Sequence, residues 1–111
     1  MELLKKISQE ILSVSDIETQ FVKCQIEIFT NEKGSGITGE CFDLNNLKVS
    51  YLDVFELNLD FNDLIQEWFN ISRLSENRWN KAEFTVNKDG RYDVKTWWDS
   101  EFQISLYGED N

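Results

Sequence analysis

The sequence predicts an α+β fold, with an antiparallel sheet of about five to six strands and helices packed on one side. Apolar residues recur at helical spacing over residues 2–14 and again over about 61–75. Between and after these segments, shorter runs alternate apolar and polar residues and are separated by turn residues, as in antiparallel hairpins. At 111 residues and 41% hydrophobic content, the chain is expected to form a single domain over 1–111.

The first half of the chain is expected to supply one helix and three strands. The apolar stripe of the helix over 2–14 consists of Leu4, Ile7, Ile11 and Val14. Alternation then predicts strands over 21–30, 37–44 and 47–57, joined by a loop at 31–36 and a turn at 43–46. Gly39 marks a bulge or a bend within the second strand.

The second helix is the most strongly patterned element. Asp60 stands at the N-cap position, where its carboxylate is expected to accept the first free backbone N–H groups. Asp63 falls in the first turn, where the helix dipole favours a negative charge. The predicted buried stripe comprises Phe61, Leu64, Ile65, Trp68, Phe69, Ile71 and Leu74.

A hairpin follows this helix. Trp79 is expected to anchor it in the core, and residues 82–86 alternate before a turn over 87–90 in which Gly90 suits a left-handed conformation. Alternation over 92–98 then places Trp98 in the core and Trp97 on the opposite face of the sheet. Residues 102–107 also alternate, which predicts a last strand or an extended tail, and 108–111 are expected to fray.

The charge of the chain is strongly negative. Eleven basic residues against twenty-one acidic ones leave a net charge of −10, which repels nucleic acid and anionic membranes and attracts a basic protein partner. Solubility alone is an alternative explanation. The longest stretch without a base runs from Lys48 to Arg73 and contains five acids: Asp53, Glu56, Asp60, Asp63 and Glu67.

Other sequence features favour a cytoplasmic protein. The chain has no apolar run of the roughly 18 residues needed to span a membrane, and its first residues enter a helical pattern without a signal-peptide core. Cys24 and Cys41 each fall within a predicted strand, which is typical of small buried hydrophobes rather than of a disulfide framework.

The residue types argue against catalysis. Histidine, the commonest general base and metal ligand, is absent from the sequence, and two separated cysteines do not make a zinc site. The available carboxylate pairs, Asp53 with Glu56 and Asp99 with Glu101, lie in acidic segments typical of solvated surface. We therefore expect no enzyme activity, cofactor or metal. A deep pocket holding a carboxylate with a raised pKa would favour the alternative of an enzyme or a small-ligand binder.

Trp97 is the aromatic residue with a predicted functional role. On an open sheet face, beside Lys95 and near Asp99, it would suit an interface anchor, because tryptophan is enriched at the energetic centres of interfaces. The alternative is that a second layer covers the ring or that the ring lies flat on the sheet. The sequence leaves both interpretations open.

Residues 61–99 combine a helix with a hairpin in which a tryptophan opens a strand, an Asp-Gly turn follows and an aromatic–acidic pair closes the hairpin. The residues of this pattern are Trp79, Phe84, Thr85, Val86, Asp89, Gly90, Arg91, Tyr92, Trp98 and Asp99. In this pattern the region resembles the YezG-like family of bacterial immunity proteins. The resemblance implies a small cytoplasmic protein that binds and neutralises a cognate toxin, often a nuclease.

The negative charge of the chain agrees with this implication, because a nuclease is basic where it binds phosphate. The function expected from the sequence is a toxin inhibitor acting by protein–protein contact, as a monomer or a homodimer. The alternative is an acidic adaptor or regulatory module with no toxin partner. The predicted contact residues are Trp97 as the anchor, with Asp93, Asp99, Glu101, Asp53 and Glu56 for electrostatic steering.

Overall fold

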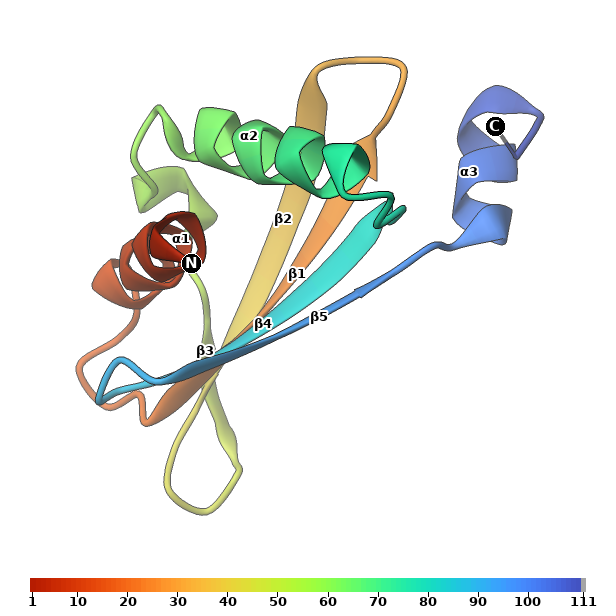
Figure 1. The fold of residues 1–111 in the computed structure, drawn as a ribbon. Helices are drawn as coiled ribbons and strands as arrows, with labels where there is room; N and C mark the ends of the chain where they lie inside the picture. The colour runs from red at the N-terminus through yellow and green to blue at the C-terminus, as the bar shows by residue number, and fades with distance from the viewer. Residues whose placement is uncertain (111) are drawn as a thin grey trace.

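The structure, a computed structural model, describes residues 1–110. Within them, five antiparallel strands form one sheet in the order β3-β2-β1-β4-β5, and helices α1 and α2 cover one face of it (Figure 1). The α+β class and the two helices on one side of the sheet are therefore confirmed. The elements in chain order are α1 (Glu2–Ser13), β1 (Phe21–Phe29), β2 (Gly34–Phe42), β3 (Lys48–Tyr51), the 3₁₀ turn η1 (Val54–Glu56), α2 (Phe61–Leu74), β4 (Lys81–Asn87), β5 (Tyr92–Trp97) and α3 (Ser100–Tyr107).

The core lies between the sheet and the two helices. Alternate residues of β1 and β4 point toward the helices and are buried, while their neighbours point to the opposite face, which we call the open face. The helices contribute Ile7, Ile11, Phe61, Ile65, Trp68 and Phe69, and the strands contribute Val22, Cys24, Ile26, Ile28, Cys41, Ala82, Phe84 and Val86. These periodicities are the ones predicted for 2–14, 21–30, 61–75 and 82–86.

Trp79 anchors the hairpin in this core, as expected. Its ring centroid lies 4.4 Å from that of Trp68 and 5.3 Å from that of Phe69, and Trp68 also meets Phe84 edge-on at 5.4 Å. Aromatic rings arranged in this way add stabilisation beyond the area that they bury. The cluster fastens α2 to β4.

The turn between β4 and β5 also has the predicted form. Gly90 adopts a left-handed conformation with φ of 94°, and its N–H donates to the Asn87 carbonyl at 2.9 Å. Glycine adopts such a φ without steric cost. The turn therefore fixes the register of the hairpin.

Two expectations for α2 are wrong. The buried stripe is narrower than predicted, because Ile71 lies on the solvent side and Leu74, in the last turn, is 88% exposed. Asp60 occupies the N-cap position, but among residues 1–110 its carboxylate accepts no capping hydrogen bond. With ψ near 3°, its backbone is outside the extended region that usually aims an N-cap side chain at the first N–H groups.

The strands on the β3 side differ from their predicted bounds. β2 begins at Gly34 rather than at residue 37, and β3 ends at Tyr51 instead of continuing toward residue 57. The ladder of β1 and β2 is regular through Gly39, and the irregularity lies between Cys41 and Phe42, opposite β3. Gly39 is thus neither a bulge nor a bend.

Gly39 is needed instead for a close approach of the chain segment that follows β3. The Leu52 N–H donates to the Gly39 carbonyl at 2.8 Å, and a Cβ at position 39 would lie 2.7 Å from the Cβ of Leu52. Leu52 is buried there, so the chain leaves the sheet at this point. The length of β3 is set by this long-range contact.

Gly39→Ala is expected to lower the free energy of unfolding by about 1–2 kcal/mol, because the added methyl group must displace backbone-attached atoms. Gly36→Ala is the matched control on the same strand. Its methyl group would have nothing nearer than 3.5 Å, an ordinary contact. Urea denaturation of both variants tests the explanation, and an equal loss in the two would contradict it.

The segment 102–107 is a helix, so the predicted last strand is wrong. The Asp99 carboxylate accepts the Phe102 N–H at 3.0 Å as an N-cap, and Gly108, with φ of 77°, ends the helix by donating to the Ile104 carbonyl at 2.7 Å. Capping residues of this kind favour a helix over an extended chain. Alternation of the apolar residues was the misleading signal.

The two cysteines are free thiols within the described part of the chain. Both are buried on the helix-facing side of adjacent strands, but they are out of register, since Cys41 lies opposite Val22 and Cys24 lies opposite Gly39. Burial raises the pKa of the Cys24 thiol to about 12. Cys24 is therefore a packing residue, as expected.

Candidate protein-binding surfaces

The six predicted contact residues fall into two groups at opposite edges of the sheet. Asp53 is the N-cap residue of η1 and Glu56 is its last residue, shortly after the edge strand β3. Asp93 and Trp97 lie in β5, the other edge strand, and Asp99 and Glu101 begin α3. The molecule therefore presents two candidate surfaces rather than one.

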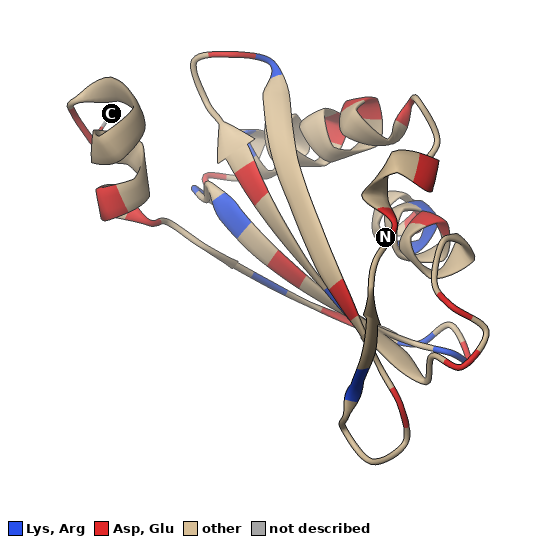
Figure 2. Ribbon diagram, turned by 180° about the vertical axis from the view of Figure 1, so that it is seen from behind, with Lys and Arg blue, Asp and Glu red and all other residues tan. Residues whose placement is uncertain are grey.

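The first group belongs to a surface that the sequence only partly revealed. We call it the acidic surface and define it by Asp53, Phe55, Glu56, Leu59, Asp60 and Asp63. Phe55 is 96% exposed and Leu59 is fully exposed, and the four carboxylates of the same segment are exposed as well. Figure 2 shows this concentration of acidic residues on η1 and α2. A large aromatic side chain held in water among carboxylates is a feature that folding alone does not require.

The geometry of η1 explains why Phe55 points outward. In a 3₁₀ turn, residues three apart share one side, and here Val54 and Leu57 share the side that packs against the core. Phe55 is thereby directed to solvent. The Asn58 N–H also donates to the Glu10 carboxylate at 2.7 Å, which ties this segment to α1.

A hollow of about 550 Å³ adjoins the acidic surface. Asp16, Asp53 and Glu56 contribute three carboxylates to its wall, and the exposed ring of Tyr51 contributes an aromatic side. Carboxylates beside an aromatic ring suit the charged head and apolar stem of a lysine or arginine side chain. The chemistry of the hollow therefore suits a basic side chain.

Trp97 lies on the open face, as predicted, and is 39% exposed. Helices α1 and α2 cover the opposite face of the sheet (Figure 1). The ring borders a hollow of about 260 Å³ whose wall includes Glu27 and Lys81. The Trp97 ring is thus partly accessible to solvent, and the rest of it packs against the sheet.

The open face as a whole is not acidic. Its charges interleave, with Lys81 lying 3.5 Å from Glu27 and Lys48 lying 3.2 Å from Glu40, and Gln25 donates to Glu83. Lysine and carboxylate side chains on neighbouring strands therefore balance one another. The acidity of the chain is concentrated elsewhere, including the acidic surface.

Asp99 has a structural role. Its carboxylate caps α3 and lies 3.1 Å from the Lys81 ammonium. The hydrogen bond from Phe102 and then the Lys81 charge hold the pKa of Asp99 below its ordinary value. The carboxylate is half-buried and engaged rather than freely solvated, which differs from the interpretation of Asp99 and Glu101 as a solvated pair.

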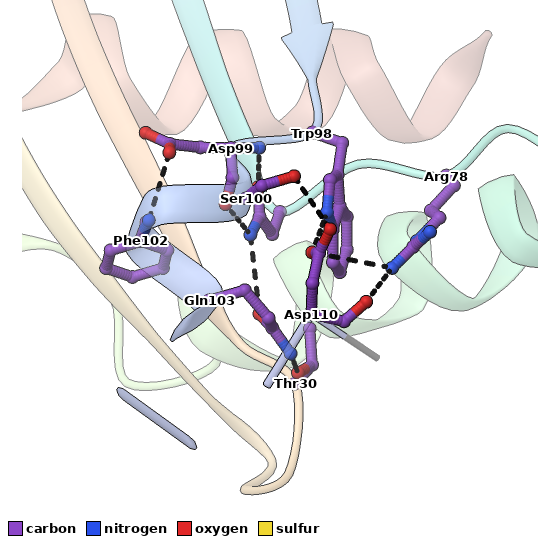
Figure 3. A network of polar contacts seen from close by, with 9 residues as sticks. Thr30, Arg78, Trp98, Asp99, Ser100, Phe102, Gln103 and Asp110 are labelled. Atoms are coloured by element: carbon purple, nitrogen blue, oxygen red, sulfur yellow. Dashed lines mark hydrogen bonds and ion pairs between the residues drawn. The ribbon is translucent and has the colours of Figure 1, made fainter. Parts of the chain in front are cut away.

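A buried amide fastens α3 to the sheet (Figure 3). The Asn80 Oδ1 accepts the Asp99 N–H at 2.7 Å, and its Nδ2 donates to the Asp99 carbonyl at 3.0 Å and to Gln103 Oε1 at 3.3 Å. Gln103 in turn donates to the Thr30 hydroxyl at 2.7 Å. These contacts join the end of β1, the start of β4 and the first turn of α3.

Trp98 belongs to a second polar cluster, so its expected place in the core is wrong. β5 ends at Trp97, and the Trp98 indole N–H donates to the Asp110 carboxylate at 2.6 Å while the Arg78 guanidinium lies 3.7 Å from the ring centroid. Ser100 also donates to Asp110, and Figure 3 shows these side chains converging on it. The hydrogen bond from Trp98 is the main reason that the pKa of Asp110 is lowered. Asp110 is therefore held rather than frayed, and Asn111 lies outside the described residues.

Neither a metal centre nor a membrane-spanning helix is found in the described residues. In residues 1–110, no cluster of three cysteine or carboxylate side chains is arranged to hold a metal ion. No helix in that range has the length and apolar content to cross a bilayer. No protein-family model matches the sequence, and no curated protein matches it significantly.

Proposed function

We propose that this protein is a non-enzymatic inhibitor that binds a basic protein through the acidic surface, in the manner of a toxin immunity protein. The observation that carries the proposal is the exposure of Phe55 and Leu59 in a segment whose four carboxylates, those of Asp53, Glu56, Asp60 and Asp63, are exposed as well. The likeness of residues 61–99 to YezG-like immunity proteins supports a toxin as the partner. The proposed partner class is a basic nuclease.

The chemistry of the acidic surface fits such a partner. Interfaces place aromatic and aliphatic anchors at the centre and charged groups at the rim, and the acidic surface contains both kinds of group, the apolar pair Phe55 and Leu59 and four carboxylates. A nuclease carries lysine and arginine where it binds phosphate, so the carboxylates would accelerate the encounter. The apolar pair would then supply the contact that slows dissociation.

Phe55→Ala is expected to weaken the complex by about 2 kcal/mol, or roughly 30-fold in Kd, which is the size of an interface hot spot. Since Phe55 is almost fully exposed in the free protein, the substitution should leave the free energy of unfolding unchanged. Leu74→Ala is the matched control, because Leu74 is also exposed but lies outside the acidic surface at the end of α2. Calorimetric titration measures both, with a catalytically inactive form of any toxin that is found encoded beside this gene.

Co-expression with the active toxin tests the function itself. Rescue of growth by the wild-type protein, and reduced rescue by Phe55→Ala at equal protein levels, are the expected results. Absence of rescue together with absence of a complex on gel filtration would refute the immunity function. A complex with another basic protein, in a genome that lacks an adjacent toxin gene, would favour the adaptor alternative.

A further inference from the structure

The outer edge of β5 carries backbone groups that no strand in residues 1–110 pairs with. β5 is the last strand of the sheet. The Asn87 N–H donates to the Arg91 carbonyl, which shows that residue 91 directs its backbone groups toward β4. Since this direction alternates along a strand, the N–H and C=O groups of Tyr92, Val94 and Thr96 point away from the sheet. They form a row of free donors and acceptors.

We infer that a second copy of this chain binds this edge, with the two β5 strands antiparallel and Val94 opposite Val94. A two-fold axis at Val94 also places Tyr92 of each copy opposite Thr96 of the other. These are the residues whose backbone groups point outward, so this register pairs all of them and leaves the β4–β5 ladder intact. The result is a continuous ten-stranded sheet.

The side chains of β5 are complementary to themselves in the same register. Asp93 of each copy lies opposite Lys95 of the other, on the open face and at a non-hydrogen-bonded pair, where side chains approach most closely. Arg91, which is well exposed, lies opposite Trp97 of the second copy, a pairing suited to a cation–π contact. A shift of the register by two residues would lose both pairings.

Charge also favours this edge over the acidic surface. Residues 87–99 contain three bases and three acids, whereas residues 51–67 contain five acids and no base. Two copies that each carry a net charge of −10 therefore repel one another less when they meet through β5 than when they meet through the acidic surface. The acidic surface follows β3, at the opposite edge of each sheet, and remains free in the dimer.

Charge reversal provides the test. Asp93→Lys places two lysines opposite each other at both symmetric pairs, and Lys95→Asp places two aspartates there. Each variant is expected to raise the dimer dissociation constant about tenfold or more. Equimolar mixing of the two variants restores opposite charges at both pairs, and so does the double variant Asp93→Lys/Lys95→Asp. Both samples are therefore expected to recover the dimer.

Sedimentation equilibrium of the full chain, over micromolar to millimolar concentrations, gives the readout. The wild-type mass should rise with concentration toward twice the 13.1 kDa of one chain. Glu67→Lys and Lys33→Asp are controls that make the same changes of charge at exposed positions away from β5, and both should dimerise like the wild type. Circular dichroism melting checks that each variant is folded.

Val94→Pro is an independent variant, because proline removes a single outward N–H and leaves the hydrogen bonds to β4 in place. It is expected to be monomeric. A wild-type protein that stays monomeric at every concentration would overturn the inference. So would a dimer that neither charge reversal weakens, since that dimer would use another face.

Discussion

Replacing Trp79 with alanine is expected to lower the free energy of unfolding by about 3–5 kcal/mol, a large share of the stability of a domain of this size. The side chain is fully buried and its ring contacts those of Trp68 and Phe69. Its indole N–H has no hydrogen-bond partner among residues 1–110, so the loss comes from packing and from the cavity that remains. Urea denaturation followed by circular dichroism measures it.

Trp97→Ala is the control for this prediction, because it removes the same side chain from an accessible position on the open face. A loss of about 1 kcal/mol or less is expected there. Trp79→Phe should fall between the two, since it keeps most of the ring packing and removes the unpaired N–H. Equal losses for Trp79→Ala and Trp97→Ala would show that the aromatic cluster does not fasten α2 to the sheet.

Replacing Asn80 with leucine is expected to cost about 2–4 kcal/mol, because a buried polar group left without its partner costs roughly 1–3 kcal/mol and this change deprives both Asp99 and Gln103. The effect should be concentrated in α3. In native-state hydrogen exchange, the amides of α3 are expected to lose protection before those of β1 and β4.

Asn70→Ala provides the comparison, since Asn70 is exposed on α2. Alanine is the better helix former, so stability should be unchanged or slightly higher. Uniform loss of protection across the whole sheet in Asn80→Leu would mean that Asn80 supports the core as a unit rather than tethering α3.

The predictable parts of the fold are those governed by local periodicity. Ile7 with Ile11 and Ile65 with Trp68 repeat at helical spacing, and a helix with one apolar side must bury that side against another element. The alternation of β1 and β4 likewise determines which residues face the helices. Local turn chemistry at Gly90 then sets the register of the hairpin.

The parts that could not be predicted depend on contacts between distant residues. β3 is short because Leu52 must fit against Gly39, and no pattern within residues 47–57 reveals that requirement. α3 has apolar residues at alternate positions and so lacks a helical stripe. Its conformation rests on the Asp99 cap and on Asn80, which lies nineteen positions before Asp99. Only the capping signals at Asp99 and Gly108 could have indicated it.

The candidate surfaces were likewise predictable only where local patterns determine them. The face on which Trp97 lies follows from strand alternation and was predictable. The sequence predicts an extended strand at Phe55, within 47–57, because a 3₁₀ turn of three residues leaves almost no periodic signal. The informative feature was the lack of any base from Asp53 to Glu67, a segment that contains five acids together with Phe55 and Leu59.

The burial of both cysteines has a practical consequence for spectroscopy. Maleimide and similar reagents attack the thiolate, and the pKa of Cys24, near 12, keeps that group protonated at neutral pH, while Cys41 is inaccessible in the native fold. A single cysteine introduced at Leu59 would therefore accept a fluorophore selectively, with both native thiols retained. Such a dye would sit where the proposed partner binds, and its emission would report complex formation directly.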